Sequence, residues 1–200
     1  MIAELFAAGV RLFTGVQAHW LGCGPDNTRR IYFANHTSNL DFLVLWSVLP
    51  ANARPKTRPV AASDYWRAGR LRFYLADHVF HGVLIERKKI TRSNNPMDLL
   101  VSVLKGGESL IIFPEGGRTT EPEMRPFKSG LYHLARAMPN VDLVPVYLDN
   151  ANRVLPKGEC LPIPFLCSVN FGVPLRLLPD ESKNAFLTRA RAAVGAMAKP

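Results

Sequence analysis

The stretch SLIIFPEGGRT, residues 109–119, decides the fold class because it joins a short apolar run to a glycine-rich turn. Ser109–Phe113 is an uninterrupted apolar run, which is typical of a buried strand. A helical pattern opens just before it at Asn95-Pro96, where proline suits the first turn, and ends at Gly106-Gly107. A buried strand that follows a helix in this way favours an α/β protein.

The alternation continues on both sides of this stretch. Further strands are expected over 30–35, 60–62, 79–87, 143–148 and 168–171, and helices over 40–49, 63–77, 129–138 and 180–198. We therefore predict a single α/β domain with a mostly parallel central sheet flanked by helices. Sheets of this kind bind ligands beyond the carboxyl ends of their strands, so residues that follow strands are the candidates for a site.

The first 22 residues are predicted to form an amphipathic helix. Glu4 and Arg11 lie on its polar side, while apolar residues recur at helical spacing: Ile2, Leu5, Phe6, Gly9, Phe13, Val16 and Trp20. Such a helix either anchors the protein in a membrane interface or packs on the domain, and both readings stay open. Residues 23–200 are then one folded domain. We expect no signal peptide, because no basic region opens the chain, and no apolar run long enough for a membrane span.

The basic charge of the chain is concentrated in one region. The formal net charge is +9, and residues 54–92 alone contain ten Lys or Arg and three acidic residues, a net of +7. A basic stretch of this kind contacts nucleic acid, an anionic membrane or an acidic carrier. It also occurs simply as a solvated face, so charge alone does not choose a partner.

Composition indicates a globular protein from a reducing compartment. Hydrophobic residues make up 48% of the 200 residues and charged residues 20%, which does not fit a disordered chain. The cysteines Cys23, Cys160 and Cys167 are odd in number and lack zinc-ligand spacing. We expect them to be small core residues, in a cytoplasmic protein without disulfides and without a metal site.

A histidine and an aspartate follow the first predicted strand of this domain, in the segment Asn35-His36-Thr37-Ser38-Asn39-Leu40-Asp41. An imidazole accepts a proton near neutral pH, and a carboxylate on its other ring nitrogen fixes the tautomer and stabilises the imidazolium. The spacing allows this pair if His36 precedes the helix and Asp41 lies in its first turn, with Thr37 or Ser38 as the cap. Taken alone, the motif is weak, and a structural histidine is the competing reading.

The turn after the 109–113 strand is a candidate anion site. Gly116 and Gly117 allow positive φ and close ligand approach, and Arg118 can clamp a phosphate with two hydrogen bonds. Glu115 can bind the arginine or a substrate hydroxyl. Two further cations follow at comparable places, since Arg87 ends the 79–87 strand and Lys128 precedes the 129–138 helix. The competing reading is a tight turn with a surface salt bridge.

Four segments in this order resemble the blocks of the glycerolipid acyltransferases, the lysophosphatidate acyltransferase family. His36-(x4)-Asp41 matches the family's His-x4-Asp block, and Gly82–Arg87 is similar to its Gly-x-x-Phe-Ile-x-Arg block, with Leu84 in place of phenylalanine. Residues 113–119 resemble its Phe-Pro-Glu-Gly-Thr-Arg-Ser block, and 144–146 its final apolar block. The chain departs from the family at Gly117, where threonine is usual, and at Thr119, where serine is usual.

The resemblance implies that residues 23–200 are an acyltransferase domain with His36 and Asp41 as catalytic residues. It implies transfer of a fatty acyl group from acyl-CoA or acyl-ACP to the hydroxyl of lysophosphatidate, giving phosphatidate. The thioester is a co-substrate, and no cofactor is expected. By the same resemblance the acceptor's phosphate and glycerol are positioned by Arg87, Glu115 and Arg118, with Gly116, Gly117 and Lys128 as further binding residues.

Several alternatives remain beside this prediction. The same fold and chemistry serve other acceptors, such as glycerol 3-phosphate, a lyso-ornithine lipid or another lysolipid. A hydrolase is disfavoured because no Gly-x-Ser-x-Gly motif occurs. A non-catalytic basic module that binds membranes or nucleic acid explains the charge but not the four blocks, and no nucleic-acid motif is present. We expect a peripheral protein on the cytoplasmic face of an anionic membrane, with no nucleic-acid partner.

Overall fold

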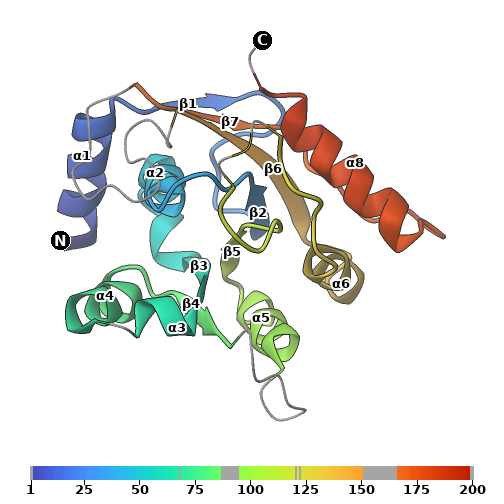
Figure 1. Ribbon diagram of the computed structural model, residues 1–200, viewed down its shortest axis with the longest axis horizontal. Helices are drawn as coiled ribbons and strands as arrows, with labels where there is room; N and C mark the ends of the chain where they lie inside the picture. The colour runs from blue at the N-terminus through green and yellow to red at the C-terminus, as the bar shows by residue number, and fades with distance from the viewer. Residues whose placement is uncertain are drawn as a thin grey trace.

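Seven strands form one central sheet in the computed structural model (Figure 1). The structure describes residues 2–67, 69–86, 95–119, 121, 123–150 and 166–198, and only the backbone of Tyr65, Leu71 and Arg72. The strand order is β1-β7-β6-β2-β5-β3-β4, with β1 (Gln17–Trp20), β2 (Arg30–Ala34), β3 (Thr57–Ala62), β4 (Val83–Ile85), β5 (Ser109–Ile112), β6 (Asp142–Asp149) and β7 (Ser168–Phe171). Every neighbouring pair is parallel except β6 with β7. This confirms the predicted α/β fold with a mostly parallel sheet.

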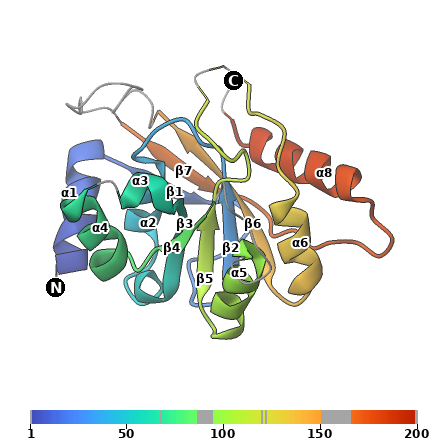
Figure 2. The same cartoon turned by 60° about the horizontal axis from the view of Figure 1, so that its bottom comes forward.

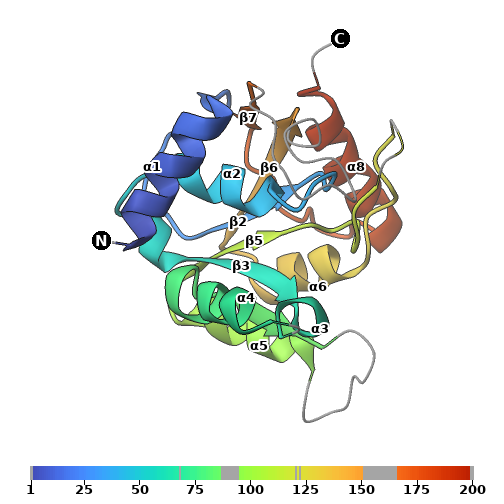
Figure 3. The same cartoon turned by 60° about the vertical axis from the view of Figure 1, so that its left-hand side comes forward.

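Helices cover both faces of the sheet, as Figures 1 and 3 show. Helices α1 and α2 pack on one face, and α5, α6 and α8 pack on the other. The helical segments are α1 (Ile2–Thr14), α2 (Asp41–Val48), the 3-10 turn η1 (Arg54–Lys56), α3 (Ser63–Trp66), α4 (Arg70–Tyr74), the π-helical turn η2 (Leu75–Val79), α5 (Pro96–Lys105), α6 (Gly130–Ala137) and α8 (Lys183–Gly195).

The central strands are continuously apolar because both faces of the sheet are buried at these strands. In β2, Tyr32 and Ala34 point into the core under α1 and α2, while Ile31 and Phe33 point into the core under α5, α6 and α8. All four side chains are buried, because successive residues of a strand face opposite sides and both sides are covered. The sheet therefore separates two apolar cores, and its polar residues lie at the strand ends.

The predicted N-terminal helix is shorter than expected. It ends at Thr14, and Gly15 follows with a φ of +54°, a conformation that ends helices. Residues 17–20, which were expected to continue the helix to residue 22, instead pair in parallel with β7. Trp20 stacks on Phe171 with ring centroids 3.8 Å apart. The helical spacing of Val16 and Trp20 was thus a coincidence, and long-range strand pairing decided their conformation.

The region after β3 also departs from expectation. A single helix was predicted over 63–77, but the structure has α3, α4 and the turn η2 in its place, grouped beside β3 and β4 (Figure 2). Ser63 does not cap a helix, because its hydroxyl donates to the Glu86 carboxylate at 2.5 Å. The strand predicted over 79–87 is only Val83–Ile85 in the structure, because Val79 still belongs to η2, and residue 87 lies outside the described residues. The remaining predicted helices and strands are confirmed within a few residues. The predicted start of a helix at Asn95-Pro96 is also confirmed, and the Asn95 side chain caps this helix by accepting from the Met97 amide at 3.1 Å.

Candidate active site

The His36–Asp41 pair forms at the carboxyl end of β2, where the chain turns into α2. His36 Nδ1 lies 2.8 Å from Asp41 Oδ2. Asp41 is the first residue of α2, and the same oxygen accepts the backbone N–H groups of Thr37 at 2.6 Å and Ser38 at 2.9 Å. The predicted cap by a Thr37 or Ser38 side chain is therefore wrong. The Asp41 carboxylate itself satisfies these amides, and doing so fixes it beneath the histidine.

The surroundings of the pair suit a base. Asp41 is fully buried, whereas the His36 side chain is 21% exposed and lines a cavity. The imidazole stacks on Phe113, with ring centroids 4.2 Å apart and an angle of 22° between the planes. A carboxylate only accepts hydrogen bonds, so the neutral ring carries its proton on Nδ1. His36 Nε2 is then the nitrogen that can take a proton from a ligand.

Glu115 joins the two motifs from behind the site. Its Oε1 accepts the His36 backbone N–H at 2.8 Å, and its Oε2 accepts the Arg125 backbone N–H at 3.0 Å. The Thr119 amide completes the link by donating to the His36 carbonyl at 2.9 Å. Glu115 is buried and does not line the cavity. The structure therefore places this residue, predicted to bind substrate, as a positioning residue for the histidine loop.

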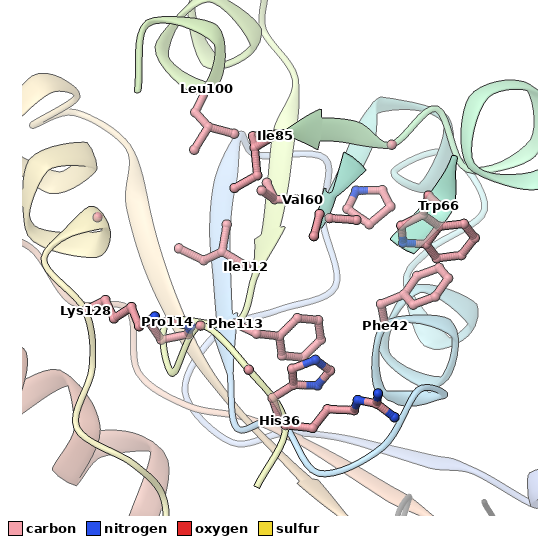
Figure 4. Close-up of a pocket in the computed structure, with 18 of the residues that line it drawn as sticks. His36, Phe42, Val60, Trp66, Ile85, Leu100, Ile112, Phe113, Pro114 and Lys128 are labelled. Atoms are coloured by element: carbon pink, nitrogen blue, oxygen red, sulfur yellow. The ribbon is translucent and has the colours of Figure 1, made fainter. Parts of the chain in front are cut away.

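An apolar cavity of about 540 Å³ opens beside the histidine. His36, Phe113 and Lys128 lie toward one end, and Ile85 and Leu100 lie toward the other (Figure 4). Most of the lining between them is aliphatic or aromatic. An apolar space of this size suits a hydrocarbon chain.

The structure brings most of the predicted binding residues to this cavity. Gly116, Gly117, Arg118 and Lys128 line it together with His36. Arg87 lies outside the described residues, so its place in the site stays a prediction. Cations and a glycine-rich turn therefore share one cavity with the base, as expected from residues that follow neighbouring parallel strands.

The two glycines of the turn have different roles. Gly116 has a φ of +72°, and a Cβ atom on it would lie 2.5 Å from Lys128 Cε. Gly117 does not have a positive φ, and among the described residues a Cβ atom there would meet nothing nearer than Arg125 Nη1 at 4.0 Å. The positive φ expected for both is thus used by Gly116 alone. Space above Gly117 is open, so its lack of a side chain is not a packing requirement.

We expect Gly116→Ala and Gly117→Ala to differ in stability. Gly116→Ala should lower the free energy of unfolding by about 1 kcal/mol or more, because alanine is strained at positive φ. Gly117→Ala should leave it unchanged within about 0.5 kcal/mol. Urea denaturation of the two variants measures this difference, and equal destabilisation would contradict the assignment of the strained position to Gly116.

The described cysteines and Ser38 are poorly suited to act as nucleophiles. Burial raises the pKa of the Cys167 thiol to about 11, and the Asp149 and Asp41 carboxylates add to the rise. Burial also raises the pKa of the Cys23 thiol. Ser38 is 1% exposed, and its hydroxyl oxygen accepts the Leu40 amide at 3.2 Å. Among the described residues, these three groups therefore offer no activated nucleophile for a covalent intermediate.

Three contributors to the site were not predicted as such. Asn35 exchanges two hydrogen bonds with the Leu148 backbone, at 3.0 Å and 2.7 Å, and so ties the end of β2 to β6. Phe113 supports the imidazole, and Arg125 is held by Glu115. Asn35 and Phe113 belong to the quoted motifs, so their position beside functional residues was a usable signal. Arg125 has no comparable signal in the sequence.

A His–Asp pair with a buried carboxylate, a glycine-rich turn with neighbouring cations and an apolar cavity together suit an enzyme whose ligand is amphipathic and carries an anionic group. The sequence model of the Acyltransferase family matches residues 19–149. The chain is 31% identical over 162 residues to a 1-acyl-sn-glycerol-3-phosphate acyltransferase of Cocos nucifera, covering 76% of this chain and 47% of the relative. It is 28% identical to the human 1-acyl-sn-glycerol-3-phosphate acyltransferase alpha, covering 79% of this chain and 54% of the relative.

The fold has a counterpart among solved structures. The 1-acyl-sn-glycerophosphate acyltransferase PlsC of Thermotoga maritima superimposes with a TM-score of 0.72 at 19% identity, over 98% of this chain and 76% of that chain. This likeness concerns the fold alone. The chain belongs to the Acyltransferase family, in agreement with the resemblance of its four blocks. It spans about half the length of the curated relatives it matches.

Proposed function

We propose that the protein transfers a fatty acyl group from an acyl thioester to the free hydroxyl of lysophosphatidate, forming phosphatidate. The observation that carries this proposal is the His36–Asp41 pair at the cationic end of an apolar cavity. Names of the relatives support the choice of acceptor, since they are acyltransferases of 1-acylglycerol 3-phosphate. The donor is acyl-CoA or acyl-ACP, used as a co-substrate without a cofactor.

The reaction proceeds by direct attack. His36 Nε2 removes the proton of the acceptor hydroxyl as its oxygen attacks the thioester carbonyl carbon. Asp41 stabilises the imidazolium through the hydrogen bond to Nδ1. The tetrahedral intermediate then collapses, the carbon–sulfur bond breaks, and the proton passes from His36 to the leaving thiolate. The ester and a free thiol are the products.

Different parts of the site hold the two substrates. The apolar stretch of the cavity, toward Ile85 and Leu100, accepts the donor's acyl chain. Arg118 and Lys128, together with Arg87 as predicted from the family resemblance, bind the acceptor's phosphate near His36. Glu115 contributes by binding the backbone of His36 and the backbone of Arg125, which fixes their relative position.

An acyl-transfer assay on the purified protein tests the proposal. The acceptors are lysophosphatidate, glycerol 3-phosphate and a lyso-ornithine lipid of matched chain length, each with an acyl-CoA and an acyl-ACP donor. We expect lysophosphatidate to give the highest kcat/KM with at least one donor. Preferred transfer to another acceptor would correct the substrate, and absence of transfer to all of them would overturn the proposed activity.

We also propose that the protein is peripheral on the cytoplasmic face of an anionic membrane. Apolar side chains are exposed on α1 and α4, which lie along the same side of the molecule (Figures 1 and 2): Ile2, Leu5, Leu12, Phe13, Phe73 and Tyr74. Exposed cations accompany these apolar side chains. Arg11 belongs to α1, Arg70 belongs to α4, and Arg67 lies between α3 and α4. In the described parts of the chain, no helix has the length and apolarity of a bilayer span.

Binding to lipid vesicles measures the contribution of this surface to membrane association. Leu5 is 68% exposed on α1, and Leu5→Asp should weaken partitioning onto anionic vesicles by about ten-fold or more, because it removes a side chain that inserts into the interface. Leu178→Asp is the matched control, since Leu178 is 55% exposed before α8. Binding should also fall as salt increases. Equal partitioning onto neutral and anionic vesicles would contradict the electrostatic contribution.

A further inference from the structure

The open space above Gly117 faces an arginine that belongs to neither sequence motif. The nearest atom to a Cβ built on Gly117 is Arg125 Nη1, at 4.0 Å. Gly117 lines the cavity beside Arg118 and Lys128. The Arg125 guanidinium therefore lies beside the glycine turn, next to the cavity wall that Gly117 forms, although Arg125 itself does not line the cavity.

The charge of Arg125 is not neutralised within the described residues. Arg125 is exposed, and no described carboxylate pairs with its side chain. Several other arginines do form ion pairs, such as Arg58 with Glu108 and Arg189 with Glu181. Arg125 thus presents an exposed cation beside the glycine turn.

The backbone of Arg125 is nevertheless held in place. Its N–H donates to Glu115 Oε2 at 3.0 Å, and the other oxygen of the same carboxylate accepts the His36 N–H. Three residues later, the Lys128 N–H donates to the Pro114 carbonyl at 2.8 Å. Segment 125–128 is thereby bound to the turn at two points. The backbone of Arg125 therefore has a fixed position relative to His36.

We infer that Arg125 is an acceptor-binding residue that contacts the phosphate of the acceptor above Gly117. This inference rests on the proposed function, which supplies an acceptor with a phosphate monoester. Such a group carries about −1.5 to −2 charges near pH 7, more than one cation neutralises. A guanidinium binds phosphate oxygens through two parallel hydrogen bonds. Arg125 joins Arg118 and Lys128 in this task and favours acceptors with an anionic head.

Steady-state kinetics of Arg125→Gln test the inference. Glutamine keeps the backbone N–H that donates to Glu115. It removes only the positive charge and the paired N–H donors of the guanidinium. We expect the KM for lysophosphatidate to rise by about ten-fold or more, with the donor KM unchanged. Arg125→Lys should recover part of the loss. With a monoacylglycerol of the same chain length, which lacks the phosphate, Arg125→Gln should behave as the wild type.

Arg136→Gln is the matched control. Arg136 is exposed in the last turn of α6, so this variant makes the same charge change at a position outside the glycine turn and outside the segment 125–128 that is bound to it. Its acceptor KM should equal that of the wild type. An unchanged acceptor KM in Arg125→Gln, or an equal loss on lysophosphatidate and monoacylglycerol, would overturn the role of Arg125.

The two proposals fail in distinguishable ways. Transfer by the wild type with normal acceptor kinetics in Arg125→Gln removes only the role of Arg125. No transfer by the wild type to any acceptor removes the proposed function, and direct binding then still tests the arginine. Glycerol 3-phosphate, titrated into wild type and Arg125→Gln and followed by NMR, should bind the variant about ten-fold more weakly. Equal binding would overturn the inference.

Discussion

His36→Ala should lower kcat/KM for acyl transfer by about 10²–10⁴-fold, the usual contribution of a positioned general base. The variant lacks the nitrogen that removes the acceptor's proton, while the cavity and its cations remain. We therefore expect the loss in kcat, with a smaller change in the acceptor KM. Steady-state kinetics with lysophosphatidate and a thioester donor measure both constants.

The Tm of His36→Ala shows whether the loss of activity comes from misfolding. The His36 side chain is partly exposed, and among the described residues its ring makes one hydrogen bond, to Asp41. If His36→Ala lowers the free energy of unfolding by about 1 kcal/mol, the Tm should fall by about 2–4 °C for a chain of this size. His133→Ala, an exposed histidine on α6, is the control and should retain full activity. Near wild-type kcat in His36→Ala would refute the catalytic assignment.

Asp41→Asn should lower kcat by about 10²–10⁴-fold with little change in structure. One carboxylate oxygen, Oδ2, accepts from His36, Thr37 and Ser38, and an amide oxygen can occupy the same place. Oδ1 has no hydrogen-bond partner in the described structure, so the amide nitrogen can take its position. Asparagine therefore preserves these three contacts and removes the negative charge that stabilises the imidazolium, at the expense of a buried NH2 group without a described acceptor.

Asp41→Ala separates the structural contribution of the same residue. It leaves the two backbone amides without their acceptor, at about 1–3 kcal/mol for each buried donor. We expect a clear fall in Tm for alanine and a small one for asparagine, with both variants inactive in acyl transfer. Asp98→Asn, an exposed position in the first turn of α5, is the control for loss of one carboxylate. Wild-type kcat in Asp41→Asn would show that the charge is not used.

Strands of the central sheet were predictable because local composition and burial agree there. The runs at 30–34 and 109–112 are apolar on every residue that must face a core, and both cores cover them. Local pattern failed at 17–20, where helical spacing continued by chance. Pairing with β7 and the stacking of Trp20 on Phe171 determine that segment, and both involve residues about 150 positions away.

By itself, the sequence determined the His36–Asp41 pair, the α/β class and the family, because each depends on residues close together in the chain or on short motifs in order. Only the tertiary structure decided how the two motifs are joined. The carboxylate of Glu115 reaches across 79 residues to the His36 amide and also holds Arg125. Contacts of this kind follow from how strands are ordered in the sheet, which places β5 beside β2 and so brings their carboxyl ends to one cavity.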